Sequence, residues 1–471
     1  MSSSQPVSSA RNGGVSFWYD ELGLPAATPP LGGPLTVDVA VVGGGYTGLW
    51  TAYYLKRARP SLRIAVLEQR FCGYGASGRN GGWLYNGFAG RGVFARRYGK
   101  PRAVALQRAM TAAVDEVLRV CAAEGIDADA HRGGVLEVAR TPAQLARLDA
   151  YLTDEHAYGV TDVERLDAAA SRARIDVAGT LGGVWNPHGA RIQPAKLVRG
   201  LADAVRALGV EVFEQTAVTE IHPASSGSRA RAVTPHGTVS AEYVLRCTEG
   251  FTANLRGEKR SWLPMNSSLI VTEPLGKEFW DSVGWEGRET LGDMAHAYMY
   301  AQRTADDRIA LGGRGVPYRF GSRTDNDGGT HQRTIEQLHE ILTRFFPALR
   351  PGVRIEHAWS GVLGVPRDWC STVTLDRASG LGWAGGYVGS GVTTTNLAGR
   401  TLRDLVLGED TELTALPWVG HRVRKWEPEP LRWLGVQAMY AAYHAADRAE
   451  SAGRGTTSPI ARVADVVSGR H

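Results

Sequence analysis

The chain of 471 residues has little cysteine, little lysine and no long apolar run. Its four cysteines, Cys72, Cys121, Cys247 and Cys370, form no Cys-x-x-Cys pair, which argues against a disulfide scaffold and against a structural zinc site. No stretch of about 18 apolar residues is present, so we expect no membrane span, and the polar first residues do not have the pattern of a secretory signal. These absences predict a cytoplasmic protein without a metal site.

Charge of one sign is not concentrated anywhere in the sequence. The chain has 53 basic residues, only six of them lysines, and 48 acidic residues, and both signs are scattered along it. A nucleic-acid-binding protein needs basic residues gathered on one face, so we expect no nucleic-acid partner. The sequence does not indicate an oligomeric state.

Glycine, in contrast, is in excess. The chain has 58 glycines, which is about 12% of its residues against an average usage of about 7%. They follow no three-residue period, which excludes a collagen-like chain. Thirteen of them fall in three clusters, at residues 43–48, 73–82 and 385–391.

Hydrophobic patterning predicts an α/β chain. Residues 37–42 and 64–67 have the pattern of buried strands on either side of a helix over 46–57, which together form a βαβ unit. Strand-like runs dominate between about 240 and 390, which favours a second, antiparallel sheet. Helical spacing is found over 102–124, 141–157, 195–208, 331–346 and 431–450.

The first glycine cluster has the pattern of a dinucleotide fingerprint. Gly43, Gly45 and Gly48 occupy the three glycine positions of G-x-G-x-x-G between the first strand and the first helix. They allow a tight turn, a close approach of the backbone to a pyrophosphate, and close packing of helix on strand. Glu68 ends the second strand, where a carboxylate can accept the hydroxyls of an adenosine ribose. This motif is shared by NAD and FAD proteins.

The second cluster, residues 73–82, reads Gly-Tyr-Gly-Ala-Ser-Gly-Arg-Asn-Gly-Gly. So many glycines predict a backbone that lies close to a flat or bulky group. Together with residues 37–48, Glu68 and the third cluster, this segment resembles the FAD-dependent D-amino-acid oxidase and glycine oxidase-like flavoenzymes, and within them the gamma-glutamylputrescine oxidoreductase type. The resemblance covers residues 17 to about 415. It implies noncovalent FAD, because the histidine or cysteine that holds a covalent flavin in relatives is missing near residues 79 and 360.

The third cluster begins another helix, whose N-terminus carries a partial positive charge. In the family that this chain resembles, such a turn points at the pyrimidine ring of the flavin. The alternative, a second dinucleotide site for NADPH, has the wrong glycine spacing here and no strand ending in an acid after it. The FAD-contacting residues that motif and resemblance imply are Gly43, Gly45, Tyr46, Thr47, Gly48, Glu68, Gln69, Arg70, Ala76, Ser77, Arg79, Asn80, Gly81, Gly82, Trp83, Val218, Thr248, Gly361, Gly389, Gly391, Val392 and Thr393.

The same resemblance implies two interleaved domains. The FAD-binding domain is α/β, and the chain as a whole is of the α+β type because the second domain has an antiparallel sheet. It has a discontinuous Rossmann-like FAD-binding domain over residues 17–100, 180–255 and 365–415. A substrate domain with an antiparallel sheet takes residues 101–179 and 256–364. Residues 1–16, rich in serine and glycine, are expected to be disordered, and residues 416–471 to form a C-terminal helical extension.

The reaction implied by the resemblance is oxidation of a primary or secondary amine to an imine, which water hydrolyses, with oxygen as the electron acceptor. Amino acids, polyamine derivatives and aminophosphonates are candidate substrates. Ala310 stands where sarcosine-oxidase-like relatives place a lysine for oxygen activation, so the acceptor stays open. The alternatives are a dehydrogenase of amino or hydroxy acids that uses a quinone or a carrier protein, and the flavin subunit of a hetero-oligomeric oxidase.

Candidates for the catalytic face come from the predicted substrate domain. Tyr298 and Tyr300 alternate in a strand-like run and share one face. Arg314 has the chemistry to hold a carboxylate or phosphonate group, although a surface arginine would look the same in the sequence.

Three further residues complete the predicted catalytic set. Trp359 matches the W-x-G strand that the family places at the flavin edge, and a core tryptophan is the alternative. Glu249 follows a predicted strand and Asp368 follows a turn at Pro366, and either can accept the proton of an ammonium group.

Overall fold

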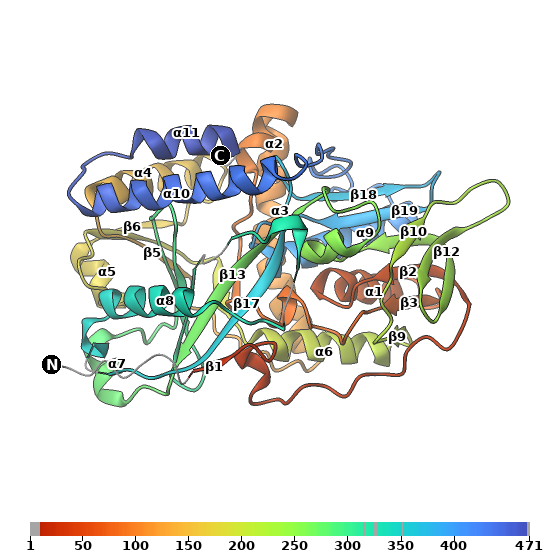
Figure 1. Ribbon diagram of the computed structural model, residues 1–471, viewed down its shortest axis with the longest axis horizontal. Helices are drawn as coiled ribbons and strands as arrows, with labels where there is room; N and C mark the ends of the chain where they lie inside the picture. The colour runs from red at the N-terminus through yellow and green to blue at the C-terminus, as the bar shows by residue number, and fades with distance from the viewer. Residues whose placement is uncertain (1–9, 314–316, 325–326, 351, 469–471) are drawn as a thin grey trace.

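The computed structural model describes residues 10–313, 317–324, 327–350 and 352–468 (Figure 1). Two large sheets occupy the two halves of the view in Figure 1, and the chain passes between them several times. One sheet is parallel at its centre and the other is mainly antiparallel. The predicted α/β class with interleaved segments is therefore confirmed.

The parallel centre of the first sheet is the predicted βαβ unit with its neighbours. Strand β2 pairs in parallel with β3 and β12, β3 with β9, and β12 with β19. The strands of this sheet are β10 (Glu220–His222), β11 (Ala230–Thr234), β12 (Gly237–Arg246), β2 (Leu35–Val42), β3 (Ile64–Leu67) and β9 (Glu211–Phe213) in spatial order, with β19 (Leu381–Gly385) beside β12 and β18 (Thr372–Asp376) beside β19.

Among the described residues, the second sheet has nine strands, and only its β1–β17 and β14–β5 pairs are parallel. In spatial order they are β1 (Arg11–Asn12), β17 (Ile355–Val365), β13 (Leu263–Thr272), β16 (Ile309–Gly313), β15 (Tyr300–Arg303), β14 (Thr290–Asp293), β5 (Val135–Ala139), β7 (Gly182–Asn186) and β6 (Glu164–Asp167). A short antiparallel pair, β4 (Trp83–Tyr85) and β8 (Gly189–Arg191), lies outside both sheets.

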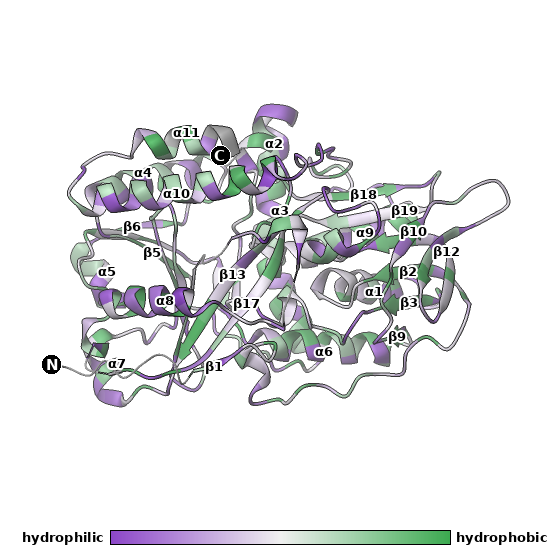
Figure 2. Ribbon diagram, in the orientation of Figure 1, coloured by the Kyte–Doolittle hydropathy of each residue, from purple (hydrophilic) through white to green (hydrophobic). Residues whose placement is uncertain are grey.

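Alternate side chains of β2 and β3 build two cores. Val39 and Val41 pack with residues of helices α1, α3, α6 and α9, whereas Ala40 and Val42 pack with residues of β11 and β12. The strongly hydrophobic colour of β2 and β3 in Figure 2 reflects burial on both faces. The helices are α1 (Tyr46–Ala58), α2 (Arg91–Tyr98), α3 (Lys100–Ala123), α4 (Pro142–Ala157), α5 (Ala168–Arg174), α6 (Pro194–Ala207), α7 (Lys277–Val283), α8 (Gln332–Phe345), α9 (Gly391–Leu407), α10 (Leu431–Ser451) and α11 (Pro459–Ser468).

Three features differ from the sequence-based predictions. Residues 10–16 are ordered, because Arg11 and Asn12 pair with β17 and Val15 is buried. Strand β7 belongs to the second sheet, although residues 180–255 were assigned to the FAD-binding domain. Helix α11 follows the single helix that was predicted for the C-terminal extension, and the two pack together. With these changes, the division into two domains stays a prediction.

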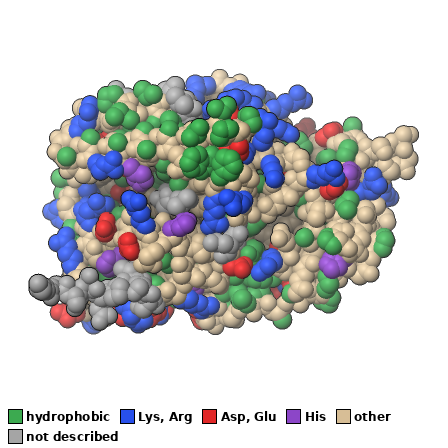
Figure 3. All heavy atoms as spheres, viewed as in Figure 1, with side chains coloured by type: hydrophobic (Ala, Val, Ile, Leu, Met, Phe, Trp, Pro, Cys, Tyr) green, Lys and Arg blue, Asp and Glu red, His purple; other side chains and the backbone are tan. Residues whose placement is uncertain are grey.

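The surface agrees with the scattered charges of the sequence. Figure 3 shows lysine and arginine side chains spread over the visible face, with acidic side chains among them. Hydrophobic side chains gather over one end of α10, where Leu431 and Leu434 are exposed (Figure 3). No helix among the described residues is long and apolar enough to cross a membrane.

Candidate active site

The three glycine clusters meet around one cavity of about 1230 Å³. The first cluster lies at the end of β2 and the start of α1, the second includes the short 3-10 helix Ala76–Gly78, and the third leads into α9. Segments that are more than 300 residues apart in the chain thus share a single site.

The turn from β2 to α1 requires glycine at two positions. Gly43 has a φ of 109°, and a Cβ atom there would lie 2.6 Å from the carbonyl oxygen of Cys247. At Gly48 a Cβ atom would lie 2.0 Å from the carbonyl oxygen of Gly43. Because glycine has no Cβ atom, α1 can pack closely against β2. This packing directs the N-terminal N–H groups of α1 at the cavity.

Glu68 lies at the cavity end of β3. Its carboxylate accepts hydrogen bonds from the backbone N–H groups of Gly44, at 2.7 Å, and Arg70, at 2.9 Å. Burial raises the pKa of Glu68, and the two backbone donors act against that shift. An acid held in this way is placed to accept the hydroxyl groups of a ribose.

The second glycine segment lies directly on the start of α1. The hydroxyl oxygen of Ser77 accepts a hydrogen bond from the Tyr46 N–H at 2.8 Å. Arg79 is buried, donates from Nε to the carbonyl oxygen of Tyr74 at 2.7 Å and places its guanidinium 4.4 Å from the centre of the Tyr74 ring. Gln302, which the sequence reasoning missed, donates from Nε2 to the carbonyl oxygen of Gly81 at 2.7 Å and so ties this segment to β15.

Glu249 holds the third segment in place. Its carboxylate accepts hydrogen bonds from the backbone N–H groups of Gly364 at 3.1 Å, Gly386 at 2.8 Å and Tyr387 at 3.2 Å. Burial raises the pKa of Glu249 to about 7. Tyr387 in turn lies with its hydroxyl 3.0 Å from the hydroxyl of Thr47, which joins the starts of α9 and α1.

This lining fits the predicted FAD. Two helix N-termini and a carboxylate converge on the cavity, and a Cβ atom at Gly389 or Gly391 would have no neighbour closer than 3.7 Å, so backbone is open there to a ligand. The volume exceeds the roughly 300–1,000 Å³ of ordinary ligand pockets, which leaves room for a substrate beside a dinucleotide.

Most of the predicted residues line this cavity. They are Gly43, Gly45, Tyr46, Thr47, Glu68, Gln69, Ala76, Ser77, Arg79, Asn80, Gly81, Trp83, Val218, Thr248, Gly361, Gly389, Gly391 and Val392, with Glu249, Tyr298 and Tyr300 from the catalytic set. The described residues Gly48, Arg70, Gly82, Thr393, Trp359 and Asp368 were predicted too, but they do not line it. Arg314 lies outside the described residues.

Trp359 supports the second glycine segment from behind instead of forming the cavity wall. It is fully buried, and its indole N–H donates to the carbonyl oxygen of Arg79 at 2.8 Å. Its ring contacts those of Phe17 and Trp18. Trp359 is therefore a core residue, which was the alternative interpretation of its place in the sequence.

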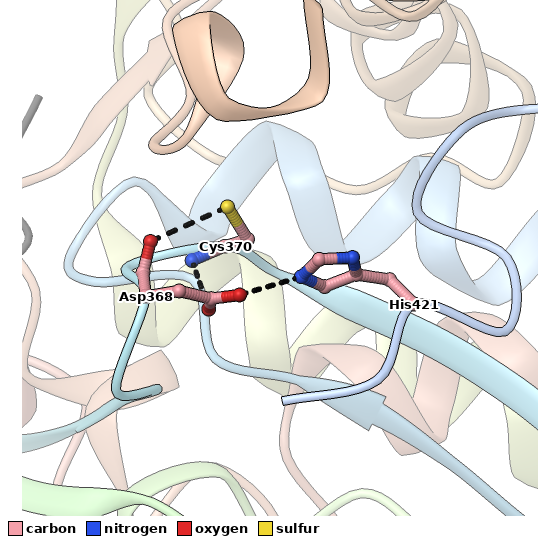
Figure 4. Close-up of side chains that lie close together, drawn as sticks. All are labelled: Asp368, Cys370 and His421. Carbon is pink, nitrogen blue, oxygen red and sulfur yellow. Dashed lines mark hydrogen bonds and ion pairs between the residues drawn. The ribbon is translucent and has the colours of Figure 1, made fainter. Parts of the chain in front are cut away.

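Asp368 lies in a separate cluster with Cys370 and His421 (Figure 4). Its carboxylate is 2.8 Å from Nε2 of His421 and accepts the N–H of Cys370 at 3.2 Å. The other His421 nitrogen, Nδ1, lies 2.8 Å from the Tyr98 hydroxyl, and burial raises the pKa of Cys370 above its ordinary range. The three side chains are of the kinds that ligate metals, but here they form hydrogen bonds with one another. The hydrogen bond between His421 and Tyr98 holds this segment to α2.

A further part of the cavity was not predicted. Its lining comes from β5, β14, α2, α4 and the C-terminal helix α10. Short strands with mixed residues and an amphipathic helix carry no motif, so only the folded arrangement identifies them. The residues concerned include Glu137, Tyr151, Asp293, Val436, Met439, Tyr440 and Tyr443.

Known proteins resemble this chain over most of its length. The profile of the family described as FAD dependent oxidoreductase matches residues 38–405. Gamma-glutamylputrescine oxidoreductase of Escherichia coli (strain K12) is 33% identical over 399 residues, which are 82% of this chain and 87% of that protein.

Two solved structures show the same fold. Glycine oxidase from Geobacillus kaustophilus matches with a TM-score of 0.66 and 22% identity over 82% of this chain and 99% of its own. L-proline dehydrogenase from P. horikoshii matches with a TM-score of 0.68 and 17% identity over 82% of this chain and 98% of its own. At these identities the likeness concerns the fold alone.

Proposed function

Because the chain belongs to the FAD dependent oxidoreductase family, we propose that it oxidises a primary or secondary amine. Its cofactor is FAD, as the family resemblance implied. The proposal is carried by one observation: the cavity that fits FAD continues into a part lined by tyrosines and buried carboxyl groups, which suit a nitrogen base. The name of the Escherichia coli relative, gamma-glutamylputrescine oxidoreductase, supports the same class of substrate.

The overall reaction balances with oxygen as the acceptor. Bound FAD would supply the acceptor for a hydride from the carbon beside the amine nitrogen. The nitrogen loses a proton, and water hydrolyses the resulting C=N bond to a carbonyl compound and ammonia or a smaller amine. Dioxygen takes the two electrons and two protons and leaves as hydrogen peroxide.

The chain's own residues position the reactants. The Tyr300 hydroxyl lies 2.8 Å from Ser267 Oγ, and its ring lies against Gly81, where a Cβ atom would be 2.7 Å away. This places a flat wall next to the FAD-binding segment. Glu249 is the better of the two predicted proton acceptors, because it lines the cavity and burial raises its pKa to about 7, whereas Asp368 is bound to His421.

Anaerobic mixing with amines tests the proposal. The holoenzyme should lose its oxidised flavin absorbance with a member of a panel of amines, polyamines, amino acids and aminophosphonates, and should form hydrogen peroxide when air is admitted. Loss of colour with hydroxy acids alone would contradict amine oxidation. Loss of colour with an amine but no peroxide, together with reduction of a quinone or dye, would replace oxygen by another acceptor.

The FAD is held without a covalent bond. Precipitation of the holoenzyme with acid is therefore expected to leave the flavin in the supernatant, where its absorbance should account for about one FAD per chain. A yellow pellet after repeated washing would contradict noncovalent binding. A chain denatured with FAD added afterwards provides the control for flavin trapped in the precipitate.

A further inference from the structure

The part of the cavity lined by β5, β14, α2 and α4 carries charges of both signs. The charges that form no ion pair within the chain determine the charge of the ligand that this part favours. Arg91 forms ion pairs with Asp154 at 2.6 Å and Glu155 at 2.7 Å. Arg147 forms one with Glu450 at 2.7 Å. These arginines are neutralised by the chain itself, so they do not favour an anionic ligand.

Two carboxyl groups in this part form no ion pair among the described residues. Glu137 lines the cavity, and no described donor or cation contacts its carboxylate. Asp293 accepts a hydrogen bond from the Met299 N–H at 3.0 Å but forms no ion pair among the described residues. The remaining arginine of this lining, Arg96, is exposed to solvent.

The neighbouring strand leaves room for the Glu137 carboxylate. Gly292 on β14 pairs with Glu137 on β5, and a Cβ atom at Gly292 would come within 2.4 Å of Glu137 Oε2. Burial raises the pKa of Glu137 to about 8, and the nearby charge of Asp293 adds to the shift. Tyr151 and Tyr298 also line the cavity, and aromatic rings in a lining favour a bound cation.

Ionising a buried carboxyl group without a partner is costly, and a cation brought by a ligand lowers that cost. The ligand must therefore present positive charge next to Glu137 while its reacting nitrogen lies at the flavin. The reacting nitrogen has to be neutral to lose a hydride from its carbon, so the positive charge belongs to a different nitrogen.

We propose that Glu137, together with Asp293, binds a second, protonated nitrogen of the substrate, and that the enzyme prefers diamines and polyamine-like amines over monoamines. This inference rests on the proposed oxidation of amines. An aliphatic ammonium group has a pKa of about 10.4, so the distal nitrogen is charged at neutral pH. Glu137 is a residue that determines specificity and takes no part in the transfer of the hydride.

The test compares Glu137→Gln with the wild-type holoenzyme. Anaerobic flavin reduction is followed by stopped flow with 1,4-diaminobutane, 1,5-diaminopentane, their mono-N-acetyl derivatives and the monoamines of the same length. Loss of a charge-assisted contact should raise the dissociation constant of the diamines about 10- to 100-fold. The monoamines and the acetylated amines, which lack the distal charge, should change by less than about threefold.

Glu164→Gln provides the matched control, because Glu164 lies on the same sheet but is exposed. In Glu164→Gln, the limiting rate of flavin reduction and the dissociation constants of all these amines should be unchanged, since this side chain lies outside the cavity. Equal weakening of diamines and monoamines in Glu137→Gln would overturn the inference, as would a wild-type enzyme that does not distinguish them.

A second measurement separates this inference from the proposed reaction. Bis-quaternary dications of the same chain length cannot be oxidised through a neutral nitrogen, and their binding is measured by the perturbed absorbance of the bound flavin. They should bind at least about tenfold more tightly than mono-quaternary analogues to wild type but not to Glu137→Gln. If no amine reduces the flavin yet this difference is found, the proposed reaction fails and the cation site stands; if the difference is absent, the cation site fails.

Discussion

Replacing Gly48 with alanine is expected to lower the free energy of unfolding of the apoprotein by about 3 kcal/mol or more and to abolish retention of FAD during purification. A Cβ atom at this position would lie 2.0 Å from the carbonyl oxygen of Gly43 and 3.0 Å from Cγ1 of Val41. The first of these atoms is backbone in the turn itself, so α1 has to move away from β2. Its N-terminal N–H groups move with it, and the phosphate-binding end of the helix is lost.

Gly45→Ala is the matched control for this change. A Cβ atom at Gly45 would meet only the Ser77 side chain, whose Oγ is 3.0 Å away, and a shift of a few tenths of an ångström relieves this contact. The apoprotein should therefore unfold within about 0.5 kcal/mol of wild type, while FAD binding weakens at least about tenfold, because the added methyl group faces the site of the pyrophosphate.

Urea unfolding of the two apoproteins and FAD titration separate the two effects. If Gly48→Ala unfolds at the same urea concentration as Gly45→Ala, the tight contact between α1 and β2 does not stabilise the fold. If Gly45→Ala binds FAD as tightly as wild type, the pyrophosphate does not approach this turn.

The parts of the fold with a local pattern were predictable. The helix expected over residues 46–57 is α1 (Tyr46–Ala58), and that expected over 331–346 is α8 (Gln332–Phe345). In α8 the buried side chains include Ile335, Leu338 and Leu342, which recur at helical spacing and mark the face that packs on the sheet.

The parts that depend on distant pairing were not predictable. Strand β1 has two residues, and it exists because Arg11 and Asn12 pair with His357 and Ala358 on β17. No local pattern in a serine- and glycine-rich segment indicates such a contact. Strand β7 joins the second sheet in the same way, through pairing with β5 and β6.

In the candidate site too, the residues in a local motif were predictable, and those defined by distant contacts were not. Glycines in a motif are recognisable because a side chain at these positions would clash with the backbone, as at Gly43 and Gly48. Gln302 and Glu137 have no such signature: a glutamine on a strand and a glutamate between apolar neighbours occur on many surfaces. The importance of Gln302 follows from its hydrogen bond to the Gly81 carbonyl group, and that of Glu137 from its place in a cavity where no described cation pairs with it.

Alanine at position 249 is expected to destabilise the apoprotein by about 3 kcal/mol or more at pH 5. The carboxylate of Glu249 receives N–H groups from Gly364 on β17 and from Gly386 and Tyr387 in the turn before α9. Removing it leaves these donors without their partner in the interior, at about 1–3 kcal/mol each. The turn before α9 should loosen, and FAD affinity should fall with it.

The pH dependence of the free energy of unfolding tests the effect of burying the Glu249 carboxyl group. The pKa of Glu249 rises from its ordinary value of 4.5 to about 7, mainly through burial. Between these values the folded chain binds a proton that the unfolded chain lacks, so the wild type loses stability as the pH rises. Glu249→Ala has no such group, and its stability gap from wild type should therefore narrow by about 2–3 kcal/mol between pH 5 and pH 8.

Urea unfolding of the wild-type and Glu249→Ala apoproteins at pH 5, 6, 7 and 8 measures this gap. Glu211→Ala, at an exposed position on β9, should follow the wild type at every pH. A gap of the same size at all four pH values would mean that Glu249 is ionised throughout and that burial does not raise its pKa. A widening gap would mean that the carboxylate is more stable in the fold than in water, so that its backbone donors outweigh its desolvation.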